Sequence, residues 1–485
     1  MGPLLAVAPH LGIIAMAMSV VHLLPIAVSL AYGDGAAGAF VISMVVNTAA
    51  GFLTWVLTRH HHVQLAPRDG ILMVVLAWCG GAAFATLPLL LVIPGLSFTD
   101  AYFETVSGLT TTGATVLTGL DTLAPSINIW RGLLVWLGGM GLIVLAVAVL
   151  PLLGVGGRQI FRAETPGPMK DTKLTPRITE TAKGLWVVYG ALSIVCAVAY
   201  KLAGMSLFDA VMHMFSTMGL GAFSSHDASF AYWHSPVIEA VAIVFMLIAG
   251  LNFGTHFLAM RMRSASPYRK DPEARLFVLV TVGSAIGIAV YLRAVGTYPD
   301  FLTALRYAAF NVISIASTTG YSNTDYNAWP IFAPMWMLFL ASFASCSGST
   351  GGGIKMIRAQ LLATQVYREF VKVLHPQAVT PIKVRGQVIE NKVVFAVLAF
   401  MFIYISSIVS LTLTLLASGL DVVTAFTAVV ASLNNTGPGL NRVGPATTYA
   451  SLTDFQTWIC TFAMLIGRLE FFTLLIVFTP AFWRK

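Results

Sequence analysis

Four short glycine-containing segments carry residue types that could hold a dehydrated cation. They read TTTGAT, GLGAFS, STTGYS and NNTGPG, and they begin at Thr110, Gly219, Ser317 and Asn434. Glycine lets the backbone adopt a positive φ and turn successive carbonyl groups to one side. Such segments around one axis would form rings of carbonyl oxygens that replace the hydration shell of a monovalent cation. One segment alone would be an ordinary glycine turn, but the repeated occurrence favours a pore.

A further glycine-rich segment lies where an unbroken helix would be expected. It reads SFASCSGSTGGGIKMIR, covers Ser342–Arg358 and lies inside a long apolar stretch. Each of its consecutive glycines costs a helix roughly 1 kcal/mol relative to alanine, so we expect the helix to break there. We interpret the segment as a flexible gate loop in the ion path. The alternatives are a passive kink and a phosphate-binding loop, although the GxxxxGK[ST] pattern of such loops is missing.

Two basic residues accompany these glycines. Arg468 lies inside the apolar run TFAMLIGRLEFFTLLIVFTP. An arginine within a membrane is costly and suggests a function, here a lower ion occupancy near the pore axis. The alternative is a structural pair with Glu470 or with loop carbonyls. Lys355 follows the glycine loop and could hold it, or could extend to the membrane interface.

The elements that must position these residues are membrane-spanning helices. Of the 485 residues, 57% are hydrophobic and 10% are charged, whereas soluble domains carry about 25% charged residues. Four scattered cysteines without CxxC spacing argue against a disulfide framework or a zinc site. The apolar segments long enough to cross a bilayer as helices are 11–32, 36–58, 70–94, 129–152, 184–204, 236–260, 276–296, 331–357, 393–418 and 456–482.

Basic residues gather in alternate loops. One such loop, between 129–152 and 184–204, holds Arg158, Arg162, Lys170, Lys173 and Arg177. The positive-inside rule places these loops and both termini in the cytoplasm, so membrane topology rather than nucleic-acid binding explains the net charge of +8. We expect a multi-pass protein of the bacterial inner membrane. The exceptions to the alternation, near span ends or in hairpins, are Arg131, Lys201, Arg293, Arg306 and Arg442.

The non-basic loops after residue 94 each contain an apolar stretch too short to span a membrane. These stretches, 99–109, 207–218, 301–317 and 420–433, are of re-entrant length. The glycines that follow them are 108, 99 and 117 residues apart, which indicates one repeated unit of span, short helix, glycine break and span. The predicted divisions are an N-terminal two-helix hairpin at 1–66, and repeats at 67–160, 161–265, 266–375 (with a broken second helix and the gate loop) and 376–485.

Acidic residues stand near the same non-cytoplasmic mouth. They could concentrate cations there, although the aspartates could instead cap the N-termini of the short helices. The residues are Asp100, Glu104, Asp209, Asp300 and Asp421.

Motifs along the whole chain resemble the TrkH branch of the Trk/Ktr/HKT potassium-transporter superfamily. They read VSGLTTTGATVLTGLD, WLGGMGLIVLAVAVLPLLGVGG, ETPGPMKDTKLTPRI, FSSHDAS, CSGSTGGGIKMIR, NNTGPGL and GRLEFFTLL. The resemblance implies an all-α integral membrane fold of four helix–pore-helix–helix repeats around a pseudo-fourfold pore. The extra N-terminal hairpin favours this branch over the KtrB-like members.

The resemblance also implies site residues. It places the gate loop at Ser342–Gly353, and the predicted gate residues are Gly348, Gly351, Gly352, Gly353, Lys355 and Arg468. Sodium-passing relatives often have serine at the first filter glycine, so Gly113 implies potassium, while Ala222 departs from the usual second glycine of its repeat. The predicted potassium-binding residues are Thr111, Thr112, Gly113, Leu220, Gly221, Thr318, Thr319, Gly320, Asn435, Thr436 and Gly437.

The function implied by the resemblance is potassium uptake, not enzyme activity. The expected partners are a second copy of the chain and a cytosolic TrkA-like ring that binds NAD or other nucleotides; this chain has no nucleotide-binding motif of its own. A sodium- or proton-coupled potassium symporter of the same fold is the alternative. A carrier with inverted repeats is disfavoured because the repeats here are parallel. A membrane-embedded enzyme is also disfavoured, because it would need clustered ionisable groups inside the spans.

Overall fold

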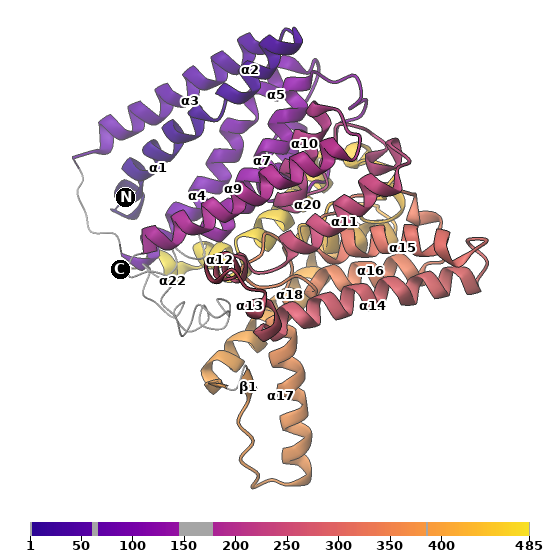
Figure 1. The fold of residues 1–485 in the computed structure, drawn as a ribbon. Helices are drawn as coiled ribbons and strands as arrows, with labels where there is room; N and C mark the ends of the chain where they lie inside the picture. Colours follow the sequence, from indigo (N-terminus) through magenta and orange to yellow (C-terminus); the bar gives the residue numbers. More distant parts are fainter. Residues whose placement is uncertain (1, 61–65, 145–177, 385–386, 485) are drawn as a thin grey trace.

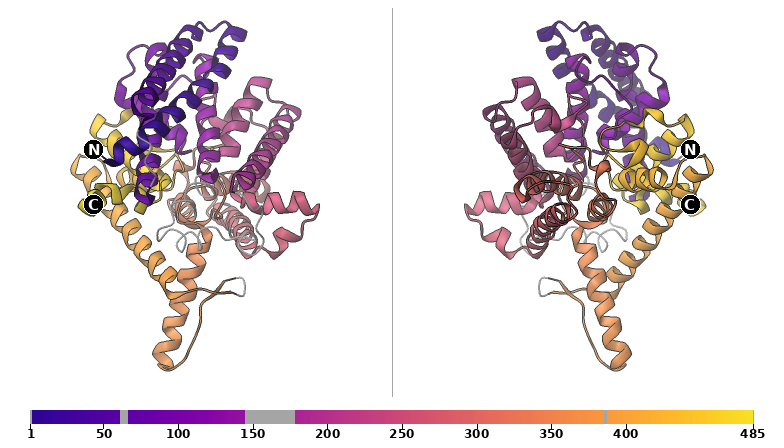
Figure 2. Two further views of the ribbon diagram at one scale, coloured as in Figure 1. Left: turned by 90° about the vertical axis from the view of Figure 1, so that its left-hand side faces the viewer. Right: turned by 90° about the vertical axis from the view of Figure 1, so that its right-hand side faces the viewer.

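The computed structural model describes residues 2–60, 66–144, 178–384 and 387–484, and these form a bundle of helices with one projecting arm (Figures 1 and 2). The arm consists of the outer part of α17 (Met356–Leu374) and the segment that returns from it to the bundle. That segment contains the short antiparallel strands β1 (Lys383–Val384) and β2 (Gln387–Val388). Apart from these two-residue strands the described residues form helices, as the all-α prediction expects.

The N-terminal hairpin consists of α1 (Gly2–Val20) with α2 (Leu23–Tyr32), and of α3 (Ala37–Thr58). The first span covers Pro3–Tyr32 and so begins earlier than the predicted 11–32. A Cβ atom added to Gly12 would lie 2.6 Å from the carbonyl oxygen of Gly51. Glycine at this crossing lets the two backbones touch, which is a common way for helices to pack in membranes.

The rest of the chain repeats one order of elements, a long helix, a short helix and a second long helix. The first unit is α4 (Pro67–Ala85) with α5 (Leu87–Val92), α6 (Phe98–Leu109) and α7 (Pro125–Val144). The second is α9 (Ile178–Leu202), α10 (Leu207–Gly219), and α11 (Pro236–Gly250) with α12 (Phe253–Met262). The third is α14 (Pro272–Ala294), α15 (Phe301–Ala316), and α16 (Phe332–Phe343) with α17. The fourth is α18 (Asn391–Ala417), α19 (Val422–Leu433), and α20 (Asp454–Arg468) with α21 (Phe471–Leu475).

Short elements complete the described chain. They are α13 (Ser266–Lys270), α22 (Pro480–Trp483) and the 3-10 turns η3 (Ser229–Tyr232), η4 (Tyr326–Ala328), η5 (Asn441–Val443), η6 (Tyr449–Ser451) and η7 (Ile476–Phe478).

Not every predicted span is one straight helix. Within the described residues, six helices are long and apolar enough to cross a membrane, and two bent pairs raise the number to eight. The predicted spans 236–260 and 456–482 bend by 95° and 116° respectively, so both are broken. The predicted span 331–357 is divided between α16 and α17. The predicted 129–152 corresponds to α7, and its last part, 145–152, lies outside the described residues, as do Arg158, Arg162, Lys170, Lys173 and Arg177.

The four short helices α6, α10, α15 and α19 match their predicted limits within two residues. Their N-termini explain the nearby aspartates. Asp300 and Asp421 are N-cap residues that accept hydrogen bonds from backbone N–H groups. Ser97 and Ser206 cap the other two helices, and their hydroxyls hydrogen-bond to Asp100 and Asp209 in the first turn. The capping alternative is therefore confirmed for Asp300 and Asp421, whereas Asp100 and Asp209 lie in the first turn and bond to the capping serines.

The units contact one another in a closed cycle. The second long helix of each unit packs against the short helix of the next one, through α7 with α10, α11 with α15, α16 with α19, and α20 with α6. The fourth unit thereby returns to the first. Segments more than 300 residues apart are brought together at the centre, where the residues that end the short helices are buried.

Candidate ion pathway

The backbone leaves each short helix in the same way in all four units. A carbonyl in the last turn accepts a hydrogen bond from the N–H group five residues later. The bonds are Thr112 to Ser107 at 2.8 Å, Gly221 to Ser216 at 2.9 Å, Thr319 to Ser314 at 2.8 Å, and Thr436 to Ala431 at 2.9 Å. The residue before each donor is left-handed, with φ of 57° at Thr111, 56° at Leu220, 63° at Thr318 and 53° at Asn435.

Left-handed residues other than glycine are uncommon, and they persist where the surrounding structure holds them. The recurrence of one such residue at the same place in four loops therefore marks a shared, constrained conformation. Because the conformation is shared, the four loops can be aligned residue by residue without reference to the spans.

This alignment corrects the predicted register of the second unit. Gly221 corresponds to Thr112, Thr319 and Thr436, and not to the glycines that follow them. Those glycines, Gly113, Gly320 and Gly437, have φ of 76°, 87° and 96°. Ala222 occupies their place in the second unit and does not have a positive φ. The sequence prediction of Gly221 had chosen the nearest glycine, whereas the hydrogen bonds show that an alanine fills the fourth place.

The four loops meet. A Cβ atom added to Gly113 would lie 2.0 Å from the backbone nitrogen of Ala222, and one at Gly437 would lie 2.7 Å from the carbonyl oxygen of Thr112. A Cβ atom added to Gly320 would lie 1.9 Å from the carbonyl oxygen of Thr436 and 2.9 Å from the Cβ of Ala222. Each loop thus touches both neighbours. Side chains at the three glycines would enter space that the adjoining backbones occupy.

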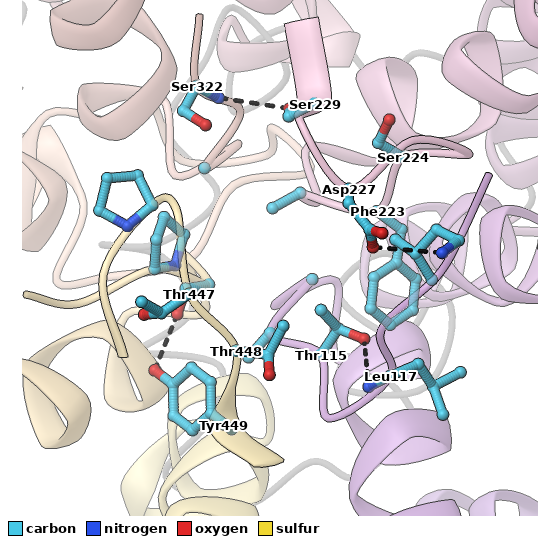
Figure 3. Close-up of a pocket in the computed structure, with 18 of the residues that line it drawn as sticks. Thr115, Leu117, Phe223, Ser224, Asp227, Ser229, Ser322, Thr447, Thr448 and Tyr449 are labelled. Carbon is cyan, nitrogen blue, oxygen red and sulfur yellow. Dashed lines mark hydrogen bonds between the residues drawn. The ribbon is translucent and has the colours of Figure 1, made fainter. Parts of the chain in front are cut away.

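A vestibule of about 340 Å³ opens onto this ring and is lined by Gly113, Ala222, Gly320 and Gly437. Its walls come from all four units, and Thr115, Ser224, Ser322 and Thr448 are among the polar residues drawn in Figure 3. The candidate filter is therefore reached from a polar-walled cavity that holds several water molecules by volume.

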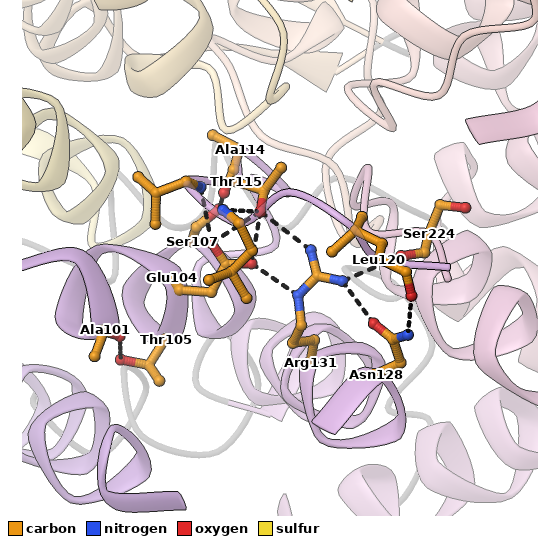
Figure 4. Close-up of polar contacts among 12 residues, drawn as sticks. Ala101, Glu104, Thr105, Ser107, Ala114, Thr115, Leu120, Asn128, Arg131 and Ser224 are labelled. Carbon is orange, nitrogen blue, oxygen red and sulfur yellow. Dashed lines mark hydrogen bonds and ion pairs between the residues drawn. The ribbon is translucent and has the colours of Figure 1, made fainter. Parts of the chain in front are cut away.

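A buried ion pair braces the first and second loops (Figure 4). Arg131 Nε lies 2.7 Å from Glu104 Oε1, and both side chains are 1% exposed. Glu104 also accepts hydrogen bonds from the Thr115 hydroxyl and, at 3.0 Å, from the Val116 N–H group. The guanidinium donates to the carbonyl oxygen of Ser224 at 3.1 Å. One carboxylate and one guanidinium thus join α6, α7 and the loops that follow the short helices of two units.

Sequence reasoning missed this brace. It assigned Glu104 to the mouth as a cation-attracting residue, which its burial contradicts, and it treated Arg131 only as an exception to the charge pattern. Arg306, another exception, makes a bidentate pair with Glu239 at 2.7 and 2.8 Å and so joins α15 to α11. The sequence did contain a signal for the pair of Glu104 with Arg131, because a glutamate inside a short apolar helix requires a cationic partner.

The predicted gate loop lies directly beneath the four-loop ring. α16 ends at Phe343 and α17 begins at Met356, so the predicted break in the helix is confirmed. The Thr350 hydroxyl donates to the carbonyl oxygen of Met218 at 3.0 Å, and the Gly352 N–H group donates to Thr318 Oγ1 at 2.9 Å. A Cβ atom at Gly352 would lie 2.1 Å from the carbonyl oxygen of Asn434. The loop therefore contacts the ends of α10, α15 and α19.

The breaks in the second and third units support each other. The Phe253 N–H group donates to the carbonyl oxygen of Gly348 at 3.0 Å, and the Cys346 N–H group donates to the carbonyl oxygen of Gly250 at 3.2 Å. Gly348 has φ of 74°, and a Cβ atom there would lie 2.9 Å from the Asn252 side chain. The predicted gate residue Gly348 thus packs against the bend between α11 and α12.

Both predicted basic gate residues bind loop carbonyls. Arg468 donates from Nη1 to the carbonyl oxygen of Thr350 and from Nη2 to that of Gly138, each at 2.9 Å. Lys355 donates from Nζ to the carbonyl oxygen of Gly351. Of the two alternatives for Arg468, loop carbonyls are the observed partners. Glu470 instead pairs with Arg358 at 2.6 Å.

A cavity of about 20 Å³ lies among Gly352, Lys355, Asn435 and Arg468, which is roughly the space that one water molecule needs. The predicted gate loop and the two basic side chains line this cavity.

A second polar cluster ties the vestibule loops together. His226 Nδ1 lies 2.5 Å from Asp121 Oδ1, and Nε2 lies 3.3 Å from Asp209 Oδ1. The ring also stacks on Tyr232 at 3.5 Å between centroids. Partial burial opposes protonation, but hydrogen bonds to the two carboxylates outweigh it and raise the pKa of His226 above 6.5. Burial opposes ionisation of Asp121 as well, but its hydrogen bonds to His226 and to the Asp227 N–H group, together with the histidine charge, lower the pKa of Asp121 below 3.8.

The chain matches known proteins over nearly its whole length. A family model described as cation transport protein TrkH matches residues 36–485. The Trk system potassium uptake protein TrkH of Halomonas elongata is 46% identical over 477 residues, which are 98% of each chain. Its namesake in Escherichia coli K12 is 43% identical over 481 residues, 99% of each chain. The crystal structure of the potassium transporter TrkH from Vibrio parahaemolyticus matches with a TM-score of 0.91 at 42% identity, covering 99% of each chain.

Replacing Glu104 with glutamine should strongly destabilise the protein. The change leaves the buried Arg131 guanidinium without its anion, and breaking such a pair costs roughly 3–5 kcal/mol. Unfolding of the purified protein in mixed detergent micelles measures the loss. Glu369 is the control, because its pair with Lys372 at 3.2 Å is exposed and its change to glutamine should alter the unfolding free energy by less than about 0.5 kcal/mol. Equal losses in the two variants would contradict the bracing role.

The His226 cluster should stabilise the protein most in weakly acidic to neutral solution. Because folding raises the pKa of His226, the protonated histidine stabilises the folded protein. This stabilisation is complete below pH 6.5, the pKa of a free histidine, and is lost as the pH rises through the folded-state pKa. Comparison of wild type with His226→Gln should therefore show a stability difference at about pH 6 that shrinks by about pH 9. Thermal unfolding across this range measures it. A difference that grows with rising pH would show that the imidazolium is not the stabilising form.

Proposed function

The chain belongs to the TrkH family of cation transport proteins, and on that premise we propose that it moves potassium ions across a membrane through the ring of four loops. The observation that carries the proposal is the mutual contact of Gly113, Ala222, Gly320 and Gly437, which come from four units distant in sequence. Four helix–pore-helix–helix repeats around a pseudo-fourfold pore account for the cyclic order of helix contacts.

The chemistry of the loops suits a potassium ion. The short helices end at the loops, so their C-terminal partial negative charges lie next to the proposed ion positions. Glycine carbonyls in left-handed conformation can turn toward the axis and replace water ligands. Among the described residues, the buried oxygens Thr111 Oγ1, Asn435 Oδ1 and Thr436 Oγ1 lack hydrogen-bond partners. Such oxygens near a filter can support a cation or its remaining water.

The segment from Ala344 to Lys355 serves as the gate in this proposal. It contacts three of the short-helix ends and is held by Arg468 and Lys355. An ion leaving the ring needs this loop to move, since the cavity beneath is only about 20 Å³. An inside-negative membrane potential would drive uptake with about 2.3 kcal/mol per charge per 100 mV.

The family and the charge pattern support a proposal for the assembly and the location. We expect a homodimer in the bacterial inner membrane with both termini in the cytoplasm. A TrkA-like nucleotide-binding ring would then meet the basic loops and the arm. The arm offers a surface for it, because Tyr367, Phe370 and Val373 on α17 are 68%, 66% and 80% exposed.

Rubidium uptake into proteoliposomes tests the function directly. Uptake that needs only a membrane potential, set by a potassium gradient, would support a gated channel-like pathway. Uptake that requires an imposed sodium or proton gradient would favour the symporter of the same fold. No uptake under any gradient by protein that retains its fold would overturn the proposal.

Changing Gly113 to serine should lower the preference for rubidium over sodium by about tenfold or more, equivalent to about 1.4 kcal/mol. Gly113 has φ of 76°, and its added Cβ would meet the Ala222 backbone at 2.0 Å, so the ring must distort. Competitive uptake of the two ions in proteoliposomes measures the ratio. Gly119→Ser is the matched control, because Gly119 also has φ of 71° but its Cβ would meet only Thr122 Oγ1, at 3.6 Å. An unchanged ion ratio in Gly113→Ser would exclude Gly113 from the filter.

Arg468 variants should show whether the arginine holds the gate loop through its hydrogen bonds or opposes ion passage through its charge. Arg468→Lys keeps the charge but cannot bridge the carbonyls of Thr350 and Gly138, which arginine reaches at 2.9 Å each. If the arginine holds the gate loop closed, Arg468→Lys and Arg468→Gln should both raise basal rubidium flux by about tenfold. Arg293→Lys, an exposed position at the end of α14, should leave the flux unchanged. Native flux in both Arg468 variants would contradict the gate assignment.

A further inference from the structure

A cavity of about 280 Å³ lies apart from the ion pathway, between α1, α3, α4 and the start of α7. Its walls include Gly12, Ala15, Gly51, Gly80 and Gly81. The crossing of Gly12 and Gly51 holds α1 and α3 together, whereas a Cβ atom added to Gly80 or Gly81 would meet nothing within 4 Å. The space is therefore left open by small residues on α4 and is not filled by any neighbouring side chain.

Two buried polar atoms in this cavity have no partner. His22 is 1% exposed and Asn47 is 3% exposed. Among the described residues, neither His22 Nε2 nor Asn47 Oδ1 has a hydrogen-bond partner, and both side chains line the cavity. Buried polar atoms in folded proteins are nearly always hydrogen-bonded, so each such exception indicates a missing partner.

The missing partner must be a hydrogen-bond donor. His22 Nδ1 lies 3.1 Å from the carbonyl oxygen of Ser19, which can only accept. Nδ1 therefore carries the hydrogen, and in the neutral ring Nε2 is left as an acceptor. Asn47 Oδ1 is an acceptor as well. Both vacant positions can be satisfied by one or two hydroxyl groups.

The rest of the cavity restricts the ligand to an uncharged, largely apolar molecule. None of the residues that line it is Asp, Glu, Lys or Arg, and an unpaired ion would be costly to bury there. Phe84, on its wall, is 38% exposed on the side of a helix that is long and apolar enough to span the membrane. The volume is close to the lower end of small-molecule sites, about 300–1,000 Å³. Entry from the bilayer suits a lipid.

We propose that the cavity between α1, α3 and α4 is a binding site for a hydroxyl-bearing neutral lipid, with the hydroxyl bound by His22 and Asn47 and the apolar body against the glycine-lined wall. The site stands independently of potassium transport. It also contacts the pathway, because the His22 ring lies 4.5 Å from that of Trp130, and the next residue, Arg131, braces two filter loops. A bound lipid would thus stabilise the position of α7.

A pair of photoreactive probes tests the site in the full-length protein reconstituted into vesicles. One is a long-chain alcohol that carries a diazirine, and the other is its methyl ether, which cannot donate a hydrogen bond. Peptide mapping should find several-fold more labelling of α1, α3 and α4 by the alcohol. Asn47→Leu and His22→Phe should each remove this preference, and Gly81→Leu should remove labelling by both probes. Val45→Leu is the control, because Val45 is 56% exposed on α3 and does not line the cavity.

Several outcomes would overturn the proposal. Equal labelling by alcohol and ether in the native protein would show an unselective apolar cleft. No labelling by either probe would show a cavity occupied by water or closed to lipid. A preference for the alcohol that persists in both Asn47→Leu and His22→Phe would place the hydroxyl elsewhere. If a variant fails to fold, the comparison of the two probes on the native protein still decides.

Discussion

Backbone groups that leave a helix at membrane depth must find hydrogen-bond partners inside the protein, and this requirement shapes the centre of the molecule. The Ser107 and Ser314 hydroxyls donate to the carbonyl oxygens of Ala114 and Tyr321, at 2.6 and 2.7 Å, in equivalent places of two loops. The Glu104 carboxylate accepts from the Val116 N–H group. These partners satisfy the outer parts of the loops and leave carbonyls near the glycines for the proposed cargo.

The same requirement joins the ring to the loop beneath it. The proposed gate segment has hydrogen bonds within itself, such as Ser345 Oγ to the Gly352 carbonyl, and it also uses the Met218 carbonyl and the Thr318 hydroxyl at the ends of short helices. Arg468 then attaches Thr350 to α7 through Gly138. In the proposed pathway, a movement of this segment would break bonds to the short-helix ends that support the four loops. Ion binding in the ring and the position of the loop are therefore expected to be energetically coupled.

The four units share a backbone plan but differ in the side chains that hold it. A buried ion pair, Glu104 with Arg131, supports the first loop, whereas Glu239 with Arg306 joins the second unit to the third. Ala222 adds a methyl group where the other units have left-handed glycine. Because one place of the ring differs, ion positions need not be fourfold symmetric. The second long helix is broken in the second, third and fourth units, but the connecting segment is long only in the third, from Ala344 to Lys355.

The sequence by itself determined the class of fold, the four short helices, three positive-φ glycines in the loops that meet, and the break at Gly351–Gly353. These follow from local properties: apolar length, cap residues and the cost of glycine in a helix. Only the tertiary structure decided the register of Ala222, the bends in the spans of the second and fourth units, and the pairing of Glu104 with Arg131. Those features depend on contacts between residues far apart in the chain, such as Asn435 Nδ2 with Thr112 Oγ1 at 3.0 Å. Hydropathy cannot report such contacts, because it sums over neighbours along the chain and contains no information about which segments meet.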